Sequence, residues 1–125
     1  MQLRGRHYPI IILGLITAAL HFGAAVDRRI FPEGPDPLFT LNGLGYLGLL
    51  GAYFLPIAWF RRRRPLVWRS LFVYTIVTIF AWVVIYVGFF VIKDGHPFFG
   101  VDAIYGVPAK LVELALLYFL WQDKS

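Results

Sequence analysis

The sequence contains no cysteine, and this absence excludes disulfide bonds, thiolate metal sites and cysteine nucleophiles. Charged side chains are also scarce, since only 15% of the 125 residues carry charge while 59% are hydrophobic. A soluble domain of this length cannot bury so much apolar surface, because small globules keep most of their residues near water. We therefore expect lipid to solvate much of the chain.

Motifs of catalysis and of cofactor binding are missing as well. The glycine-rich run 43–51 lies in an apolar stretch and lacks the Lys and Ser/Thr that a phosphate-binding loop needs. His21 lies within an apolar stretch and His96 within a Gly-His-Pro turn, an arrangement that disfavours a haem between them. His96, Asp94 and Asp102 match no metal-ligand spacing. The sequence predicts no enzyme activity, no metal and no cofactor of its own.

Four long apolar stretches are present, and each has about the 20 residues that a helix needs to cross a bilayer. They cover residues 8–26, 38–60, 67–92 and 101–121. The loops between them are too short to form a domain. We predict an all-α bundle of four transmembrane helices in a single domain, residues 1–125.

Four consecutive arginines, Arg61, Arg62, Arg63 and Arg64, separate the second stretch from the third. Positive clusters between spans favour the cytoplasmic face, so this short connection and both termini are predicted inside, and Arg61–Arg64 are predicted to contact lipid head groups. The net charge of +5 is then a topology signal and not a sign of nucleic-acid binding. Aromatic side chains at the predicted cytoplasmic ends favour the same topology: Tyr8, Trp59, Trp68 and Trp121.

The first stretch has a second interpretation. Arg4, Arg6, a short apolar run and residues 23–25 (Gly-Ala-Ala) resemble a signal peptide with a cleavage site. We interpret this segment instead as a helix of the mature protein, because the chain retains it. The expected location is the plasma membrane of a prokaryote.

Small residues three and four apart line the second stretch, at Gly43, Gly45, Gly48, Gly51 and Ala52. Such a face lets a neighbouring helix approach closely, which is the usual role of glycine in membrane helices. The alternative is a groove for a flat apolar ligand such as a quinone, a pigment or a lipid. The sequence does not separate the two.

Lys110 and Glu113 are ionisable groups inside the fourth stretch, where each costs about 2.5–3.5 kcal/mol to insert. A spacing of three residues lets them pair on one helix face, about 12 Å and 16 Å deep. They are predicted to join a polar cluster with six other side chains: Thr17, His21, Asn42, Tyr46, Trp82 and Tyr86.

Three interpretations of the pair stay open. It is a structural ion pair satisfied by neighbouring hydroxyls, or a proton or ion relay. In the third interpretation Gly106 and Pro108 break the span, so that Glu113 lies near a helix start close to the outer surface.

The chain resembles a family of small four-span prokaryotic membrane proteins of unknown function. The resemblance rests on residues 41–47 (Leu-Asn-Gly-Leu-Gly-Tyr-Leu) and on Lys110 with Glu113, although Ala109 stands where an acidic residue often precedes the lysine. It implies the fold and no activity.

Three functions follow from these features. The first is a non-catalytic accessory subunit of a larger membrane complex, with a respiratory or photosynthetic electron-transfer complex as the expected host. The second is a small homo-oligomeric transporter or channel that uses Lys110 and Glu113. The third is a lipid- or quinone-binding membrane protein. Membrane lipids and other integral membrane subunits are the expected partners.

Overall fold

The computed structural model describes residues 5–30, 32–95 and 103–123, which form helices and turns without any β-strand. The elements in chain order are α1 (His7–Val26), α2 (Pro37–Phe54), α3 (Ala58–Arg62), α4 (Arg64–Trp82), the π-helix η1 (Val83–Lys93) and α5 (Ala103–Gln122). The predicted all-helical class is therefore confirmed for this part of the chain.

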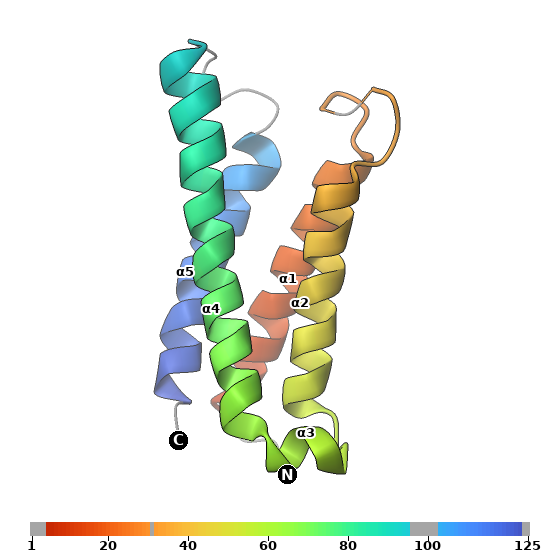
Figure 1. The fold of residues 1–125 in the computed structure, drawn as a ribbon, viewed down its shortest axis with the longest axis vertical. Coiled ribbons are helices and arrows are strands. Elements are labelled where there is room, and N and C mark those ends of the chain that lie inside the picture. The colour runs from red at the N-terminus through yellow and green to blue at the C-terminus, as the bar shows by residue number, and fades with distance from the viewer. Residues whose placement is uncertain (1–4, 31, 96–102, 124–125) are drawn as a thin grey trace.

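The long helices run up and down beside one another (Figure 1). α1 packs against α2 and α5, and α4 packs against the other faces of these two helices. Among the described elements α1 does not contact α4, so the four helices form a ring. η1 continues α4 but contacts neither α2 nor α5. The bundle is thus closed along α4 and open beside η1.

The start of α2 is fixed by its first residues. The Asp36 carboxylate accepts a hydrogen bond from the Phe39 backbone N–H at 2.9 Å, and Pro37 occupies the first turn. Both features are typical of helix N-termini. The Asp36 N–H donates to the Ala25 carbonyl at 2.9 Å, so the loop also folds back onto the end of α1.

The second helix ends earlier than predicted, and the expected span 38–60 is wrong at its C-terminal end. α2 stops at Phe54 because Leu55 precedes Pro56, and a residue before proline is driven to extended backbone. Leu55 has φ −69° and ψ 142°. The arginine run is largely helical: it divides between the short α3 and the start of α4, where Pro65 lies in the first turn.

Three helical segments are long and apolar enough to cross a membrane, by length and composition: His7–Val26, Arg64–Lys93 and Ile104–Gln122. α2 has 18 residues but less apolar character, since four glycines and Asn42 interrupt its hydrophobic side chains. The helices match a multi-pass membrane protein, with three candidate spans in the described residues.

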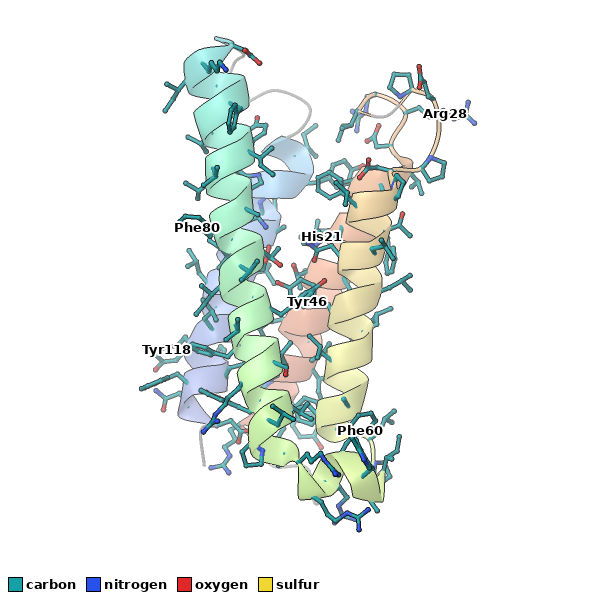
Figure 2. The ribbon with its side chains drawn as sticks, viewed as in Figure 1. His21, Arg28, Tyr46, Phe60, Phe80 and Tyr118 are labelled. Atoms are coloured by element: carbon teal, nitrogen blue, oxygen red, sulfur yellow. The ribbon has the colours of Figure 1, made fainter. Side chains whose placement is uncertain are left out.

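The exposed surface is consistent with lipid around the bundle. Phe80 and Tyr118 point away from the helices in Figure 2, and they are 68% and 61% exposed. The buried core lies between the helices and contains Ile10, Tyr46, Leu50, Leu71, Leu116 and Leu120.

The turn predicted at residues 93–97 is described only in part. Asp94 closes η1 by donating its N–H to the Phe89 carbonyl at 3.0 Å, the five-residue spacing of a π-helix. Gly95 follows with a positive φ of 75°. His96 and Pro97 lie outside the described residues.

Candidate functional site

The predicted pair on α5 forms in the interior of the bundle. The Lys110 Nζ donates to Glu113 Oε1 at 2.6 Å, and the Tyr46 hydroxyl of α2 donates to Glu113 Oε2 at 2.6 Å. Glu113 is fully buried. Both carboxylate oxygens therefore have a short, charge-assisted partner, as a buried carboxylate requires. This geometry matches the structural ion pair with a hydroxyl partner.

α5 does not break near the pair. The helix begins at Ala103 and continues through Pro108 to Gln122, so Pro108 lies inside it. Glu113 is ten residues from the helix start and fully buried. The interpretation that Gly106 and Pro108 bring Glu113 to a helix start is therefore wrong.

His21 on α1 lies beside this pair, and its tautomer follows from its partner. Its Nδ1 is 2.7 Å from the Thr17 carbonyl, and the Thr17 hydroxyl lies 3.5 Å away. A carbonyl only accepts, so Nδ1 carries a proton, and in the neutral ring Nε2 is then an acceptor. The ring also contacts Tyr46, with centroids 5.8 Å apart. Figure 2 shows His21 and Tyr46 in the space between the helices.

The Nε2 atom of His21 has no hydrogen-bond partner among the described residues. In this part of the chain every fully buried side-chain nitrogen or oxygen does have a partner. Nε2 must therefore keep some accessible surface, although the residue is only 4% exposed. His21 is one of the residues that line a cavity.

Asn42 connects α2 with α4. Its side-chain Oδ1 and its backbone carbonyl accept from the Tyr74 hydroxyl at 3.1 Å and 2.8 Å. The Tyr74 ring packs edge-on against Tyr46, with centroids 4.9 Å apart. These contacts join Asn42 to the cluster around Glu113.

Side chains spaced four residues apart along α4 and η1 face the bundle. Thr78, Trp82 and Tyr86 all line the cavity. The Trp82 and Tyr86 rings stack at 5.2 Å with an interplanar angle of 15°. Gly106 of α5 permits this arrangement, because a Cβ there would lie 2.7 Å from the indole nitrogen of Trp82.

The cavity measures about 580 Å³ and lies between α2, the α4–η1 segment and α5, bounded also by α1. Its aromatic walls are Phe39, Trp82, Tyr86 and Tyr105. Its polar lining includes His21, Asn42, Thr78 and Lys110. The cavity exists because η1 diverges from α2 and α5, and the exposed side chains Leu38 and Ile85 border it.

Seven of the eight predicted cluster residues either line this cavity or are hydrogen-bonded to a residue that does. The eighth, Tyr46, is hydrogen-bonded to Glu113 behind Lys110. Thr17 and Glu113 are the two that are hydrogen-bonded to a lining residue without lining the cavity themselves. The structure thus brings together the residues that the sequence grouped only by depth.

The glycine face divides into two parts. Aromatic side chains of the same chain fill the space at Gly43 and Gly45, where a Cβ would overlap Phe22 and the Tyr74 hydroxyl. These contacts match the helix-packing interpretation. Gly48 has open space above it, while Gly51 lies near Leu55 and Ala52 packs against the core.

A second buried carboxylate, Asp123, was missed by the sequence interpretation. Arg6 Nε lies 2.6 Å and His7 Nε2 3.1 Å from its Oδ1. The Tyr53 hydroxyl and the Arg64 guanidinium, at 3.2 Å, donate to its Oδ2. We name these five residues the Asp123 cluster. Asp123 is 3% exposed, and its partners come from the start of the chain, the end of α2 and the start of α4.

The predicted head-group arginines therefore differ in role. Arg61, Arg62 and Arg63 are exposed, and Arg63 stacks on the Trp59 ring at 4.2 Å. Arg64 instead turns inward, lies 4.0 Å from the Tyr53 ring centroid and pairs with Asp123. His7 is also buried, with 2% of its surface exposed.

At the opposite end, Asp27 joins the first loop to α5. It accepts from the Arg29 guanidinium at 2.7 Å and from the Tyr105 hydroxyl at 2.7 Å. The hydrogen bonds from Arg29 hold the pKa of Asp27 well below its usual value. The carboxylate therefore stays ionised across the neutral range.

The described residues contain no group of three or more His, Asp or Glu side chains placed to hold a metal ion. His96 and Asp102, which were considered as ligands, lie outside them. No protein-family model, curated protein or solved structure matches the chain significantly.

Proposed function

We propose that this chain binds a lipid-soluble, amphipathic small molecule in the cavity beside η1. The observation that carries the proposal is a 580 Å³ cavity with aromatic walls and convergent polar groups at His21, Asn42 and Lys110. Binding pockets for small molecules fall in the range of about 300–1,000 Å³ and combine apolar walls with a few polar groups.

The place of the cavity in the bundle supports a ligand that arrives from the bilayer. The helices beside η1 do not contact it, and Leu38 and Ile85 at the border are 76% and 54% exposed. An opening between helices with apolar edges suits a molecule dissolved in lipid. Polar groups without partners are costly in an apolar medium, so a ligand that satisfies them binds favourably.

The proposed membrane topology completes this function. α2 is taken as the fourth span, and the Arg61–Arg64 end is placed in the cytoplasm of a prokaryotic cell because positive clusters favour that side. The start of α1 and the end of α5 lie at the same end as Arg64, through their contacts with Asp123. The cavity then lies in the outer half of the membrane.

The topology is testable because the chain has no cysteine of its own. Single substitutions Arg28→Cys and Arg62→Cys, both at exposed positions, provide one reporter at each end. A membrane-impermeant maleimide is expected to label Arg28→Cys in intact cells and Arg62→Cys only after permeabilisation. Labelling of Arg62→Cys in intact cells would refute the orientation.

Ligand binding is testable by fluorescence, because Trp82 lines the cavity and the other three tryptophans do not. A variant with Trp59, Trp68 and Trp121 replaced by Phe leaves Trp82 as the only emitter. We expect a doxyl-labelled fatty ester, titrated into nanodiscs, to quench Trp82 with a saturable curve.

A matched pair of variants separates binding in the cavity from simple partition into lipid. Ala81→Phe fills the cavity, whereas Ala19→Phe adds the same side chain on the exposed surface of α1. Saturable quenching is expected to disappear in Ala81→Phe and to persist in Ala19→Phe. Linear quenching in all variants would contradict the proposal.

The accessory-subunit and transporter hypotheses stay predictions with their own tests. Purification in mild detergent with co-purifying subunits would favour the first. A flux in liposomes that Glu113→Gln abolishes would favour the second. Both carboxylate oxygens of Glu113 already have a hydrogen-bond partner. This favours a fixed ion pair over a proton or ion relay.

A further inference from the structure

The charge of Lys110, which lines the cavity, is balanced by Glu113 before any ligand enters. Two residues with charged side chains line the cavity, Asp36 before α2 and Lys110 on α5, and Glu113 pairs with Lys110 at 2.6 Å. The pair carries no net charge, whether the proton lies on lysine or on glutamate. An anionic head group would upset this balance in a low-dielectric site, so a neutral head group fits better.

Lys110 and His21 together offer a ligand both hydrogen-bond donors and a hydrogen-bond acceptor. The Lys110 ammonium has three donors, and the described residues supply one acceptor, Glu113. His21 Nε2 supplies an unpartnered acceptor in a residue that is 96% buried, since only 4% is exposed. A ligand that both accepts from Lys110 and donates to His21 would use both groups.

The walls favour a flat ring. Four aromatic residues line the cavity, and two of them, Trp82 and Tyr86, present parallel stacked rings. Flat aromatic walls bind planar ligands through offset stacking and edge contacts. The open side beside η1 leaves room for an aliphatic tail that extends into the lipid.

We propose that the cavity takes the neutral ring of a hydroquinone or quinone with an aliphatic tail, and that His21 Nε2 selects the reduced form by accepting its hydroxyl proton in a hydrogen bond. This inference rests on the proposed function, since it names the chemistry of a ligand for that cavity. A hydroquinone hydroxyl donates to His21, whereas a quinone carbonyl cannot. Both forms can accept from Lys110.

The test uses the single-tryptophan variant in nanodiscs with the doxyl ester bound. Decyl-substituted benzoquinone, its hydroquinone and decanoate are each used to displace the ester from Trp82. We expect the hydroquinone to displace it best and decanoate worst. In His21→Leu, hydroquinone affinity is expected to fall about tenfold, as for the loss of one buried hydrogen bond, while quinone affinity is unchanged.

His21→Gln is the rescue variant, because its amide oxygen restores an acceptor near the same place. Thr40→Val, on the first turn of α2, removes a hydroxyl that does not line the cavity and serves as the control. Hydroquinone affinity is expected to recover in part in His21→Gln and to be unaffected in Thr40→Val.

Each other outcome overturns the inference. An equal loss for quinone and hydroquinone in His21→Leu would mean that His21 only shapes the cavity. Stronger displacement by decanoate would mean that the site prefers an anion. If the ester binds saturably but neither ring compound displaces it, the ligand class is wrong while the proposed function stands. If the ester itself shows no saturable binding, the proposed function fails as well.

Discussion

The bundle holds one buried carboxylate near its middle and another at its arginine-rich end, and the two are stabilised differently. Glu113 has one cation three residues away on its own helix and one tyrosine from α2. Asp123 has Arg6, His7, Arg64 and Tyr53 around it, all distant in sequence. The Glu113 ion pair lies within one helix and is neutral. The Asp123 cluster joins residues that are distant in sequence and carries an excess of positive charge.

This difference shows at which end side-chain contacts join the helices and where the helices separate. The Asp123 cluster connects the start of α1, the end of α2, the start of α4 and the end of α5, so it closes that end of the ring. The Glu113 pair connects only α5 and α2. It makes no hydrogen bond to η1, and the cavity lies beside η1.

The largest expected effect comes from removing Asp123. Asp123→Ala removes the carboxylate that the buried His7 and the partly buried Arg64 both contact. Loss of one partner of a buried ion pair costs about 3–5 kcal/mol. We expect the free energy of unfolding in mixed detergent micelles to fall by about 3 kcal/mol. Asp94→Ala, an exposed carboxylate, is the control and should change it little.

Lys110 and Glu113 should show strong energetic coupling. Lys110→Met and Glu113→Gln each leave one buried group without its partner, whereas the double variant removes both charges. A double-mutant cycle measured by the same unfolding assay is expected to give a coupling energy of about 1–3 kcal/mol. Additive losses would show that the pair does not act as a unit.

The two tyrosines provide a direct comparison of the carboxylates. Tyr46→Phe leaves Glu113 with one partner, while Tyr53→Phe leaves Asp123 with three. A hydrogen bond to a charged group contributes about 1.5–3 kcal/mol. We expect Tyr46→Phe to destabilise by about 2 kcal/mol and Tyr53→Phe by less. A larger destabilisation by Tyr53→Phe than by Tyr46→Phe would contradict the interpretation that Asp123 has more partners than it needs.

The smallest effect concerns the arginine run. Arg61 is exposed, whereas Arg64 is partly buried against Asp123 and Tyr53. Arg61→Ala is expected to change the free energy of unfolding by less than about 0.5 kcal/mol. Arg64→Ala is expected to cost at least about 1 kcal/mol. Equal effects of the two substitutions would argue that Arg64 acts only at the head groups.

The polar cluster was predictable because its members lie at defined depths on apolar helices. Counting residues along each helix placed Tyr46 near the level of Lys110 and His21 somewhat closer to the outer surface, and the structure brings these residues into one cluster. Depth alone could not show that η1 diverges from α2. The cavity depends on this divergence, and the π-helical segment has no signal in its apolar sequence.

The Asp123 cluster was missed for a different reason. Its members lie near the ends of elements, where charged side chains usually meet water, so each was assigned to the surface separately. The available signal was Asp123 itself, because it is the one acidic residue among the segments predicted to be cytoplasmic. Its isolation among arginines was a reason to expect burial. The early end of α2 had a plain signal too, in Leu55–Pro56.

With α2 as the proposed fourth span, its early end has a consequence for the membrane itself. Eighteen residues of helix extend about 27 Å, which is less than the roughly 30 Å of a hydrocarbon core. The α4–η1 segment has 30 residues and exceeds that thickness. Mismatch of this kind is relieved by thinning the bilayer beside the short helix and by tilting the long one. The lipid next to α2 should therefore be compressed, and water should reach deeper on that side of the protein than on the other.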